Sequence, residues 1–132
     1  MKPRMIWSNL AVEDLERTNK FYTQLGFKIN PPHTNNELTS FSFGDNNYVI
    51  NFFLKERLKD AMKGEIADLK KGSETIFSIS ADSREEVDQC LEEVKKAGGN
   101  VFSEPENYQQ GYTFGFADPD GHKFNVLYWP GM

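Results

Sequence analysis

The sequence predicts an α+β protein in which a strand–helix–strand–strand–strand (βαβββ) module occurs twice. The order of strand-like and helix-like segments in the first half returns in the second half. The first predicted helix ends at Gly26 and the second at Gly98 or Gly99. A proline ends the short strand that follows each helix, at Pro31 and Pro105. A module of this size cannot bury both faces of its sheet alone. We therefore expect the two modules to form a curved mixed sheet around a cleft, the usual shape of a ligand site.

The first module spans about residues 5–54. Its helix is predicted where acidic residues, which the helix dipole favours in a first turn, precede Leu15, Tyr22 and Leu25 at helical spacing. A hairpin is predicted where two apolar runs flank Asp45-Asn46-Asn47. The expected elements are a strand over residues 5–12, a helix over 13–25, a short strand over 27–30, and a hairpin of strands over 38–44 and 48–54.

The second module spans about residues 74–129 and follows a charged linker over 55–72, which we expect to hold one or two helical turns. Asp82-Ser83 followed by Glu85-Glu86 is a helix start, with a polar cap and then acids in the first turn. The expected elements are a strand over residues 74–81, a helix that ends at Ala97, a short strand over 100–102, and a closing hairpin of strands over 111–116 and 122–129.

The closing hairpin turns at Asp118-Pro119-Asp120-Gly121. An aspartate can cap the turn, the proline presets its own φ, and the glycine can take a positive φ. The apolar runs on both sides carry the aromatic and β-branched residues of half-buried strands. This hairpin places Asn125 in the last strand.

Length and composition exclude several classes of protein. The 132 residues suit one domain, and the net charge of −5 argues against a nucleic-acid partner. A lone cysteine, Cys90, excludes an intrachain disulfide and a cysteine-based zinc site. No apolar run is long enough for a membrane span, and Met1-Lys2-Pro3-Arg4 leads directly into a strand-like segment. We therefore expect a cytoplasmic protein with no membrane partner.

The chain resembles the vicinal oxygen chelate superfamily, which includes glyoxalase I, extradiol dioxygenases, and bleomycin- and fosfomycin-resistance proteins. The resemblance rests on Asn9-Leu10-Ala11-Val12-Glu13-Asp14-Leu15-Glu16-Arg17, on Phe21-Tyr22, on Leu25-Gly26-Phe27, and on the closing Asp118-Pro119-Asp120-Gly121-His122. The nearest resemblance is to the branch described as predicted lactoylglutathione lyases or extradiol dioxygenases. It implies the glyoxalase/bleomycin resistance fold, a single glyoxalase-like domain over residues 1–132, and usually a homodimer.

The resemblance also implies four strand positions at which the superfamily's enzymes hold a divalent metal with His, Gln or Glu. These positions carry Trp7, Asn51, either Glu74 or Ile76, and Asn125. The indole N–H of tryptophan only donates, and neutral amide oxygens are weak ligands for Zn, Ni or Fe. We therefore expect no metal site and no cofactor, and the chelate chemistry loses its Lewis acid.

Seven residues share the parity expected to face the cleft, and together they predict an aromatic pocket with a few orienting amides. They are Trp7, Asn9, Asn51, Phe53, Asn125, Leu127 and Trp129. Eleven Phe, five Tyr and two Trp in the chain agree with an aromatic-lined pocket. The alternative is that the two tryptophans simply fill the space of the metal as core.

The leading hypothesis is a small-molecule binding protein in the style of bleomycin-resistance proteins, which hold a cationic aromatic drug without chemistry. One alternative is a metal-dependent lyase, glyoxalase I-like, or a dioxygenase. Another is a metal-free enzyme with Glu74 as the base. His122 is expected to be a turn residue, and Cys90, on the apolar stripe of its helix, a core thiol.

Overall fold

The structure is a computed structural model, and it describes residues 1–131. The chain divides into two compact units, one spanning Met1–Ala67 and the other beginning at Asp68. We call them unit 1 and unit 2 and describe each by itself.

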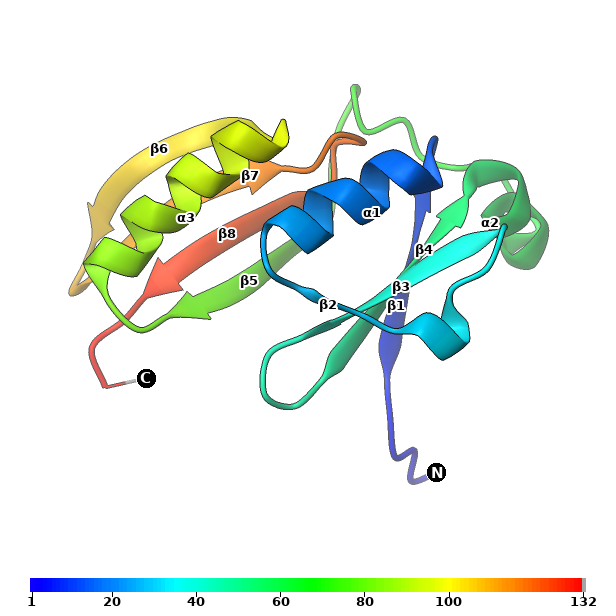
Figure 1. Cartoon of the computed structure of the whole chain (residues 1–132), viewed down its shortest axis with the longest axis horizontal. Coiled ribbons are helices and arrows are strands. Elements are labelled where there is room, and N and C mark those ends of the chain that lie inside the picture. Colours follow the sequence, from blue (N-terminus) through cyan, green and yellow to red (C-terminus); the bar gives the residue numbers. More distant parts are fainter. Residues whose placement is uncertain (132) are drawn as a thin grey trace. The chain divides into compact units, whose positions relative to one another are not determined.

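Unit 1 holds one four-stranded sheet and the α-helices α1 and α2. Figure 1 labels these strands and helices. The strand order is β1-β4-β3-β2, with β1 parallel to β4 and the other neighbours antiparallel. Its elements are β1 (Trp7–Val12), α1 (Leu15–Gln24), β2 (Lys28–Ile29), a 3-10 turn η1 (Pro31–His33), β3 (Leu38–Phe43), β4 (Tyr48–Leu54) and α2 (Lys55–Met62).

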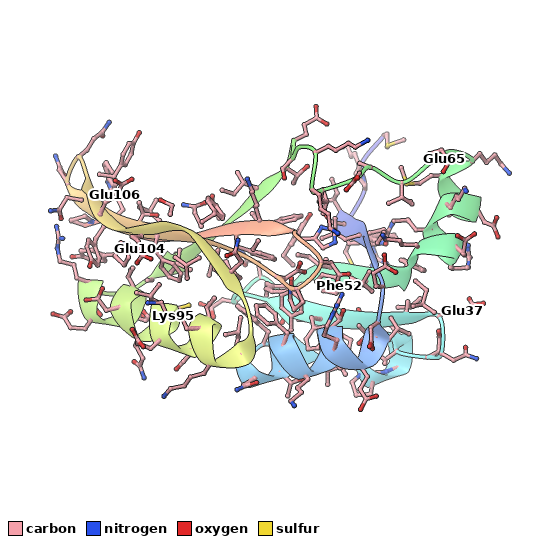
Figure 2. All side chains as sticks on the ribbon, turned by 90° about the horizontal axis from the view of Figure 1, so that it is seen from above. Glu37, Phe52, Glu65, Lys95, Glu104 and Glu106 are labelled. Carbon is pink, nitrogen blue, oxygen red and sulfur yellow. The ribbon has the colours of Figure 1, made fainter. Side chains whose placement is uncertain are left out.

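Helix α1 packs on one face of this sheet and forms the core of unit 1. The helix begins where the Asp14 side chain accepts a hydrogen bond from the backbone N–H of Arg17 at 3.1 Å. The fully buried Tyr22 ring lies 4.6 Å from that of Phe52 and 5.6 Å from that of Phe41, between centroids. Figure 2 shows Phe52 on the side of the sheet that α1 covers.

Unit 2 repeats the same arrangement with one longer helix. The strand order is β5-β8-β7-β6, with β5 parallel to β8 and the other neighbours antiparallel. Its elements are β5 (Ile76–Ala81), α3 (Arg84–Ala97), β6 (Asn100–Tyr108), β7 (Gly111–Ala117) and β8 (Lys123–Tyr128). The prediction of two βαβββ modules in an α+β fold is thus confirmed, with eight strands in two four-stranded mixed sheets.

Helix α3 buries its apolar stripe against β7 and β8. The stripe contains the buried Val87, Leu91 and Val94. In the sheet, the stacked rings of Phe116 and Phe124 have their centroids 5.2 Å apart, and both are buried. The unit therefore has its own apolar core beneath the helix.

The turn between β7 and β8 forms as predicted. The nearly inaccessible Asp118 accepts hydrogen bonds through Oδ1 from the backbone N–H groups of Asp120 and His122, at 3.0 and 2.9 Å. Gly121 has a φ of 99°, and an added Cβ there would lie 3.1 Å from the Cβ of Leu69. Asp118 and Gly121 together close the hairpin that positions Asn125.

The predicted end of one strand was wrong. The short strand over residues 100–102 continues through Pro105, as β6 runs to Tyr108. A proline is tolerated because β6 is an edge strand, and because its register shifts between Val101 and Ser103 and between Ser103 and Glu106. Pro31 and Pro105 therefore do not play the same part in the two modules, since Pro31 lies in a 3-10 turn after β2 and Pro105 lies within β6.

The predicted linker begins with a regular helix of two turns. Helix α2 follows β4 without a loop, contacts β1 and β4, and buries Leu58. It ends at Lys63, whose φ is 53°. None of the helices among the described residues is long and apolar enough to cross a bilayer.

Candidate functional site

The sheet of unit 1 has a second face, opposite α1, which we call open face 1. Neighbouring residues of a strand point to opposite faces, and the buried Phe41, Ile50 and Phe52 point to the helix. The residues between them form three rows across β1, β4 and β3. The rows are Trp7–Val49–Ser42, Asn9–Asn51–Ser40 and Ala11–Phe53–Leu38. A polar row therefore lies between two rows that are largely apolar.

Two amides meet in the middle row of open face 1. The Nδ2 of Asn51 donates a hydrogen bond to the Oδ1 of Asn9 at 3.3 Å. The Oδ1 of Asn51 is buried, and within residues 1–131 no group donates a hydrogen bond to it. Asn30 accepts from the hydroxyl of Ser42 at 2.9 Å and donates to that of Ser40 at 3.2 Å. Both serines of the face thus have a partner at its β2 edge.

The sheet of unit 2 has an equivalent face, opposite α3, which we call open face 2. Its rows run across β5, β8 and β7. They are Ile76–Lys123–Ala117, Ser78–Asn125–Gly115 and Ser80–Leu127–Thr113. Register therefore makes Ser78 the counterpart of Asn9, and Asn125 the counterpart of Asn51.

Asn125 is held on both sides within unit 2. Its Oδ1 accepts a hydrogen bond from the Ser78 hydroxyl at 2.6 Å, and its Nδ2 donates to the Thr113 hydroxyl at 3.5 Å. Thr113 in turn donates to the backbone carbonyl of Val126 at 2.8 Å. Such a chain of hydrogen bonds fixes the amide in one orientation.

Sequence reasoning missed Phe102 as a member of open face 2. Its ring lies over Gly115, where an added Cβ would come within 2.5 Å of the ring's Cζ. The Nζ of Lys123 lies 4.8 Å from the ring centroid, a cation–π contact. A glycine inside a strand often marks a close approach by another group, and Gly115 was the signal that could have revealed this ring.

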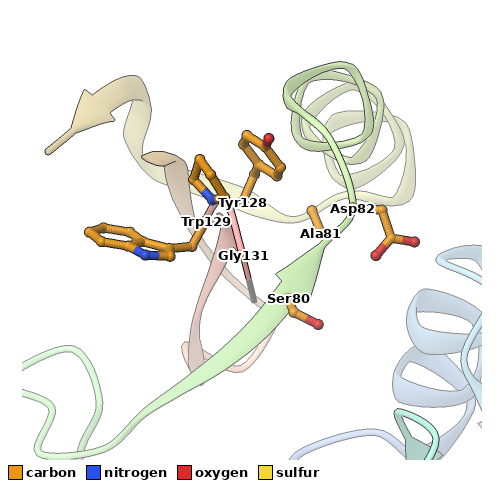
Figure 3. A pocket seen from close by; sticks show the side chains of 7 residues that line it. Ser80, Ala81, Asp82, Tyr128, Trp129 and Gly131 are labelled. Carbon is orange, nitrogen blue, oxygen red and sulfur yellow. The ribbon is translucent and has the colours of Figure 1, made fainter. Parts of the chain in front are cut away.

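Trp129 borders a hollow at the end of β8. The hollow has a volume of about 300 Å³ and is shown in Figure 3. Its lining residues are Ser80, Ala81, Asp82, Tyr128, Trp129, Pro130 and Gly131. The Trp129 ring also lies 6.3 Å from that of Tyr108, between centroids. Of the predicted pocket residues, Trp129 is the one that lines this hollow.

The predicted candidates outside the two faces have other surroundings. Glu74 is exposed and precedes β5, and the strand neighbour of Asn125 is Ser78, because Ile76 pairs with Lys123. At the turn, the backbone N–H of His122 donates to the Asp118 carboxylate, and the backbone carbonyl of His122 accepts from the Asp118 N–H. Burial, followed by Glu93 and Glu86, raises the pKa of the Cys90 thiol to about 11. A thiol with such a pKa is a poor nucleophile at neutral pH.

The superfamily's metal positions hold a donor set that does not fit a divalent transition metal. Trp7 presents an indole that is 50% exposed, and the third position offers the alkyl group of Ile76 or the exposed Glu74 that precedes β5. The Oδ1 of Asn125 is already bonded to Ser78. Across residues 1–131, no three His, Cys, Asp or Glu side chains gather in a way that could hold a metal ion. We therefore derive no chemical step through a metal.

The chain belongs to the glyoxalase/bleomycin resistance protein/dioxygenase superfamily. The family's sequence model matches residues 4–126, nearly the whole chain. The match agrees with the two βαβββ modules and with the resemblance seen in the sequence. A comparison with curated proteins gave no match.

Solved structures show the same fold. A hypothetical protein from S. aureus is 32% identical, with a TM-score of 0.86 over 98% of this chain and 96% of that one. A glyoxalase-related enzyme from Fulvimarina pelagi is 20% identical, with a TM-score of 0.83 over 97% and 90%. A lactoylglutathione lyase from Agrobacterium tumefaciens is 18% identical, with a TM-score of 0.70 over the full length of both chains.

Proposed function

We propose that this chain is a metal-independent small-molecule binding protein of the superfamily. The observation that carries the proposal is the chemistry of the positions that the resemblance assigns to a metal. Indole and amide groups occupy three of them in place of imidazoles and carboxylates, and the third position is Ile76 or the exposed Glu74. Seven residues carry the proposed binding, and each unit is considered by itself. They are Trp7, Asn9, Asn51 and Phe53 on open face 1 of unit 1, and Asn125 and Leu127 on open face 2 of unit 2 with Trp129 after the end of β8.

The environment of these residues supports binding more than filling of a core. Trp7 is half exposed, Asn9 is exposed, and Phe53 is partly exposed. Aromatic rings that stay accessible beside fixed amides are typical of ligand sites, where apolar surface supplies affinity and a few polar groups orient the ligand. We propose that the two faces serve this purpose and that no cofactor takes part.

An enzyme is the alternative function, and one observation favours it. Similar structures include a lactoylglutathione lyase and a glyoxalase-related enzyme, which suggests the lactoylglutathione-lyase-like branch. Such an enzyme would be a metal-dependent lyase or dioxygenase, or a metal-free enzyme with Glu74 as base. Glu74 is exposed and precedes β5.

We also propose a cytoplasmic homodimer whose partner is a small molecule, with no nucleic acid or membrane surface involved. The net charge of −5 supports the proposal that no nucleic acid is bound, because phosphate-rich partners are bound through clustered Lys and Arg. The homodimer follows from the superfamily, in which dimers are usual.

The decisive experiment combines metal analysis with thermal shift. The purified protein is incubated with Ni, Co, Mn, Fe and Zn, desalted, and analysed for metal. It is then screened in EDTA against small aromatic compounds. We expect far less than one ion per chain and a ligand-dependent rise in Tm that EDTA leaves intact.

Two variants identify the site in this screen. Phe53→Ala should weaken the ligand-dependent rise in Tm, while Tyr48→Ala, an aromatic residue of the same strand that points to the opposite face, should keep it. One tightly held ion per chain, or turnover that chelation abolishes, would contradict the proposal and favour the metal-dependent enzyme.

A further inference from the structure

We propose that the ligand offers a neutral hydrogen-bond donor, an N–H or O–H group on an apolar body, to the Oδ1 of Asn51. This inference rests on the proposed function, because it places the ligand on open face 1. It adds the chemical class of the ligand and the atom that recognises it. Carboxamides, alcohols and heterocycles with a ring N–H belong to this class.

The acceptor is the buried Oδ1 of Asn51. The other end of the same amide is fixed, since its Nδ2 donates to Asn9 at 3.3 Å. The oxygen therefore points in one direction, away from Asn9, and none of the described residues donates to it. A buried acceptor without a partner carries a desolvation cost that a matching donor removes. The free protein thus holds an oriented acceptor that is closed to solvent, and the ligand's donor reaches it by displacing the atoms that cover it.

The comparison with unit 2 assigns this role to Asn51 and not to Asn125. The two asparagines occupy equivalent register positions, next to Asn9 in β1 and next to Ser78 in β5. In unit 2 the Ser78 hydroxyl satisfies the oxygen of Asn125. In unit 1 the counterpart of Ser78 is Asn9, which uses its own oxygen as an acceptor. The exchange of a hydroxyl for an amide leaves one acceptor open.

The surroundings of Asn51 favour an uncharged donor on an apolar body. The rows beside it contribute Trp7 and Val49 on one side, and Phe53 on the other. None of the residues in the three rows of open face 1 is charged. An ammonium group would be desolvated there without a carboxylate to compensate it.

The charges described beside this face are already paired with each other. The guanidinium carbon of Arg57 lies 6.0 Å from the centroid of the Phe53 ring, and its Nε lies 3.3 Å from the carboxylate of Glu37. The Glu37 carboxylate is therefore engaged by Arg57 and does not compensate a cationic ligand. A neutral donor needs no counter-charge and still satisfies the acceptor.

The first test needs no ligand and compares Asn51→Leu with Asn125→Leu in urea unfolding. We expect Asn51→Leu to unfold at the same urea concentration as the unchanged protein or a higher one, because it removes an unsatisfied buried oxygen. The exposed Asn9 keeps water as a partner. Asn125→Leu should unfold at a lower concentration, since it removes two hydrogen bonds of the sheet, the one from the Ser78 hydroxyl and the one to the Thr113 hydroxyl. A larger loss for Asn51→Leu overturns the inference.

The second test uses three probes of similar size, followed by ¹⁵N NMR titration of the folded protein. Benzamide offers a neutral N–H donor, methyl benzoate only acceptors, and benzylammonium a charged donor. We expect benzamide to bind at least about fivefold more tightly than the other two, the effect of one buried hydrogen bond. Asn51→Leu should remove that preference for benzamide. If the leucine disturbs the spectrum of the folded protein, the Asn51→Ala variant is used in place of Asn51→Leu.

Each outcome separates the inference from the proposed function. Equal binding of benzamide and methyl benzoate, or a preference that survives in Asn51→Leu, overturns the donor requirement and leaves small-molecule binding intact. Tighter binding of benzylammonium overturns the neutral class and restores a cationic ligand. Binding of no probe to the unchanged protein counts against the proposed function as well.

Discussion

Gly111 and Gly115 lie on the same strand, β7, and their alanine variants should differ sharply in stability. A Cβ at Gly111 would lie 2.5 Å from the backbone carbonyl oxygen of Tyr128 and 2.9 Å from Cε3 of Trp129. Since contacts of Cβ below 3.0 Å are essentially never found, the carbonyl must move by about 0.5 Å. That movement strains the pairing of Tyr112 with Tyr128 at the end of β8.

The magnitude follows from two opposing effects. Overpacking of this kind costs about 1–3 kcal/mol. The loss of glycine's freedom in the unfolded chain returns about 0.4–1 kcal/mol. Gly111→Ala should therefore lower the free energy of unfolding by about 1–2 kcal/mol. At Gly115 the neighbour is the ring of Phe102, which is 41% exposed and can rotate into solvent, so Gly115→Ala should cost less than about 1 kcal/mol.

Urea unfolding followed by circular dichroism measures both variants against the unchanged protein. A drop of about 1–2 kcal/mol corresponds to a Tm lower by several degrees, so thermal unfolding provides an independent reading. If Gly111→Ala is as stable as the unchanged protein, or if Gly115→Ala is the less stable of the two, the distinction between a fixed backbone carbonyl and a movable ring is refuted.

Two further predictions concern α3. Burial raises the pKa of Cys90 from 9.0 to about 11, so the folded state favours the neutral thiol. The resulting stability is present below about pH 9 and is lost as the pH rises to about 11. Urea unfolding across this pH range should therefore show that the free energy of unfolding falls by about 1–2 kcal/mol more in the unchanged protein than in Cys90→Ala. If the free energies of the two proteins fall in parallel with pH, the prediction is contradicted. Ser83 caps the helix by accepting from the Glu86 backbone N–H at 3.1 Å. Ser83→Ala should lower the free energy of unfolding by about 1 kcal/mol, and Ser83→Asp should restore it; equal stability of all three proteins would show that the cap contributes nothing.

The sequence was sufficient for the order of elements because local signals mark most of them. Asp14 and Ser83 cap helices as their types suggest, and Gly121 takes the positive φ that the turn before β8 requires. The extent of β6 was not predictable in the same way. Whether a strand can continue through Pro105 depends on its place at the edge of the sheet, which is a non-local property.

For the candidate site, the sequence predicted which strand residues share a face but not the hydrogen bonds between them. Strand parity placed Asn9 and Asn51 on one face, as the structure also has them. The neighbour of Asn125 depends on the register between β5 and β8, and no local signal fixes that register. The family resemblance offered Glu74 or Ile76 at the third metal position, while the residue that bonds to Asn125 is Ser78.

The edge strand β6 has a consequence for behaviour at high concentration. An exposed edge usually offers a row of N–H and C=O groups that another chain can extend into an intermolecular sheet. Pro105 supplies no N–H to such a row, and two register shifts distort its spacing. Figure 2 shows Glu104 and Glu106 along the same strand, where their like charges repel a second copy. This edge of unit 2 is thereby protected against aggregation by strand addition.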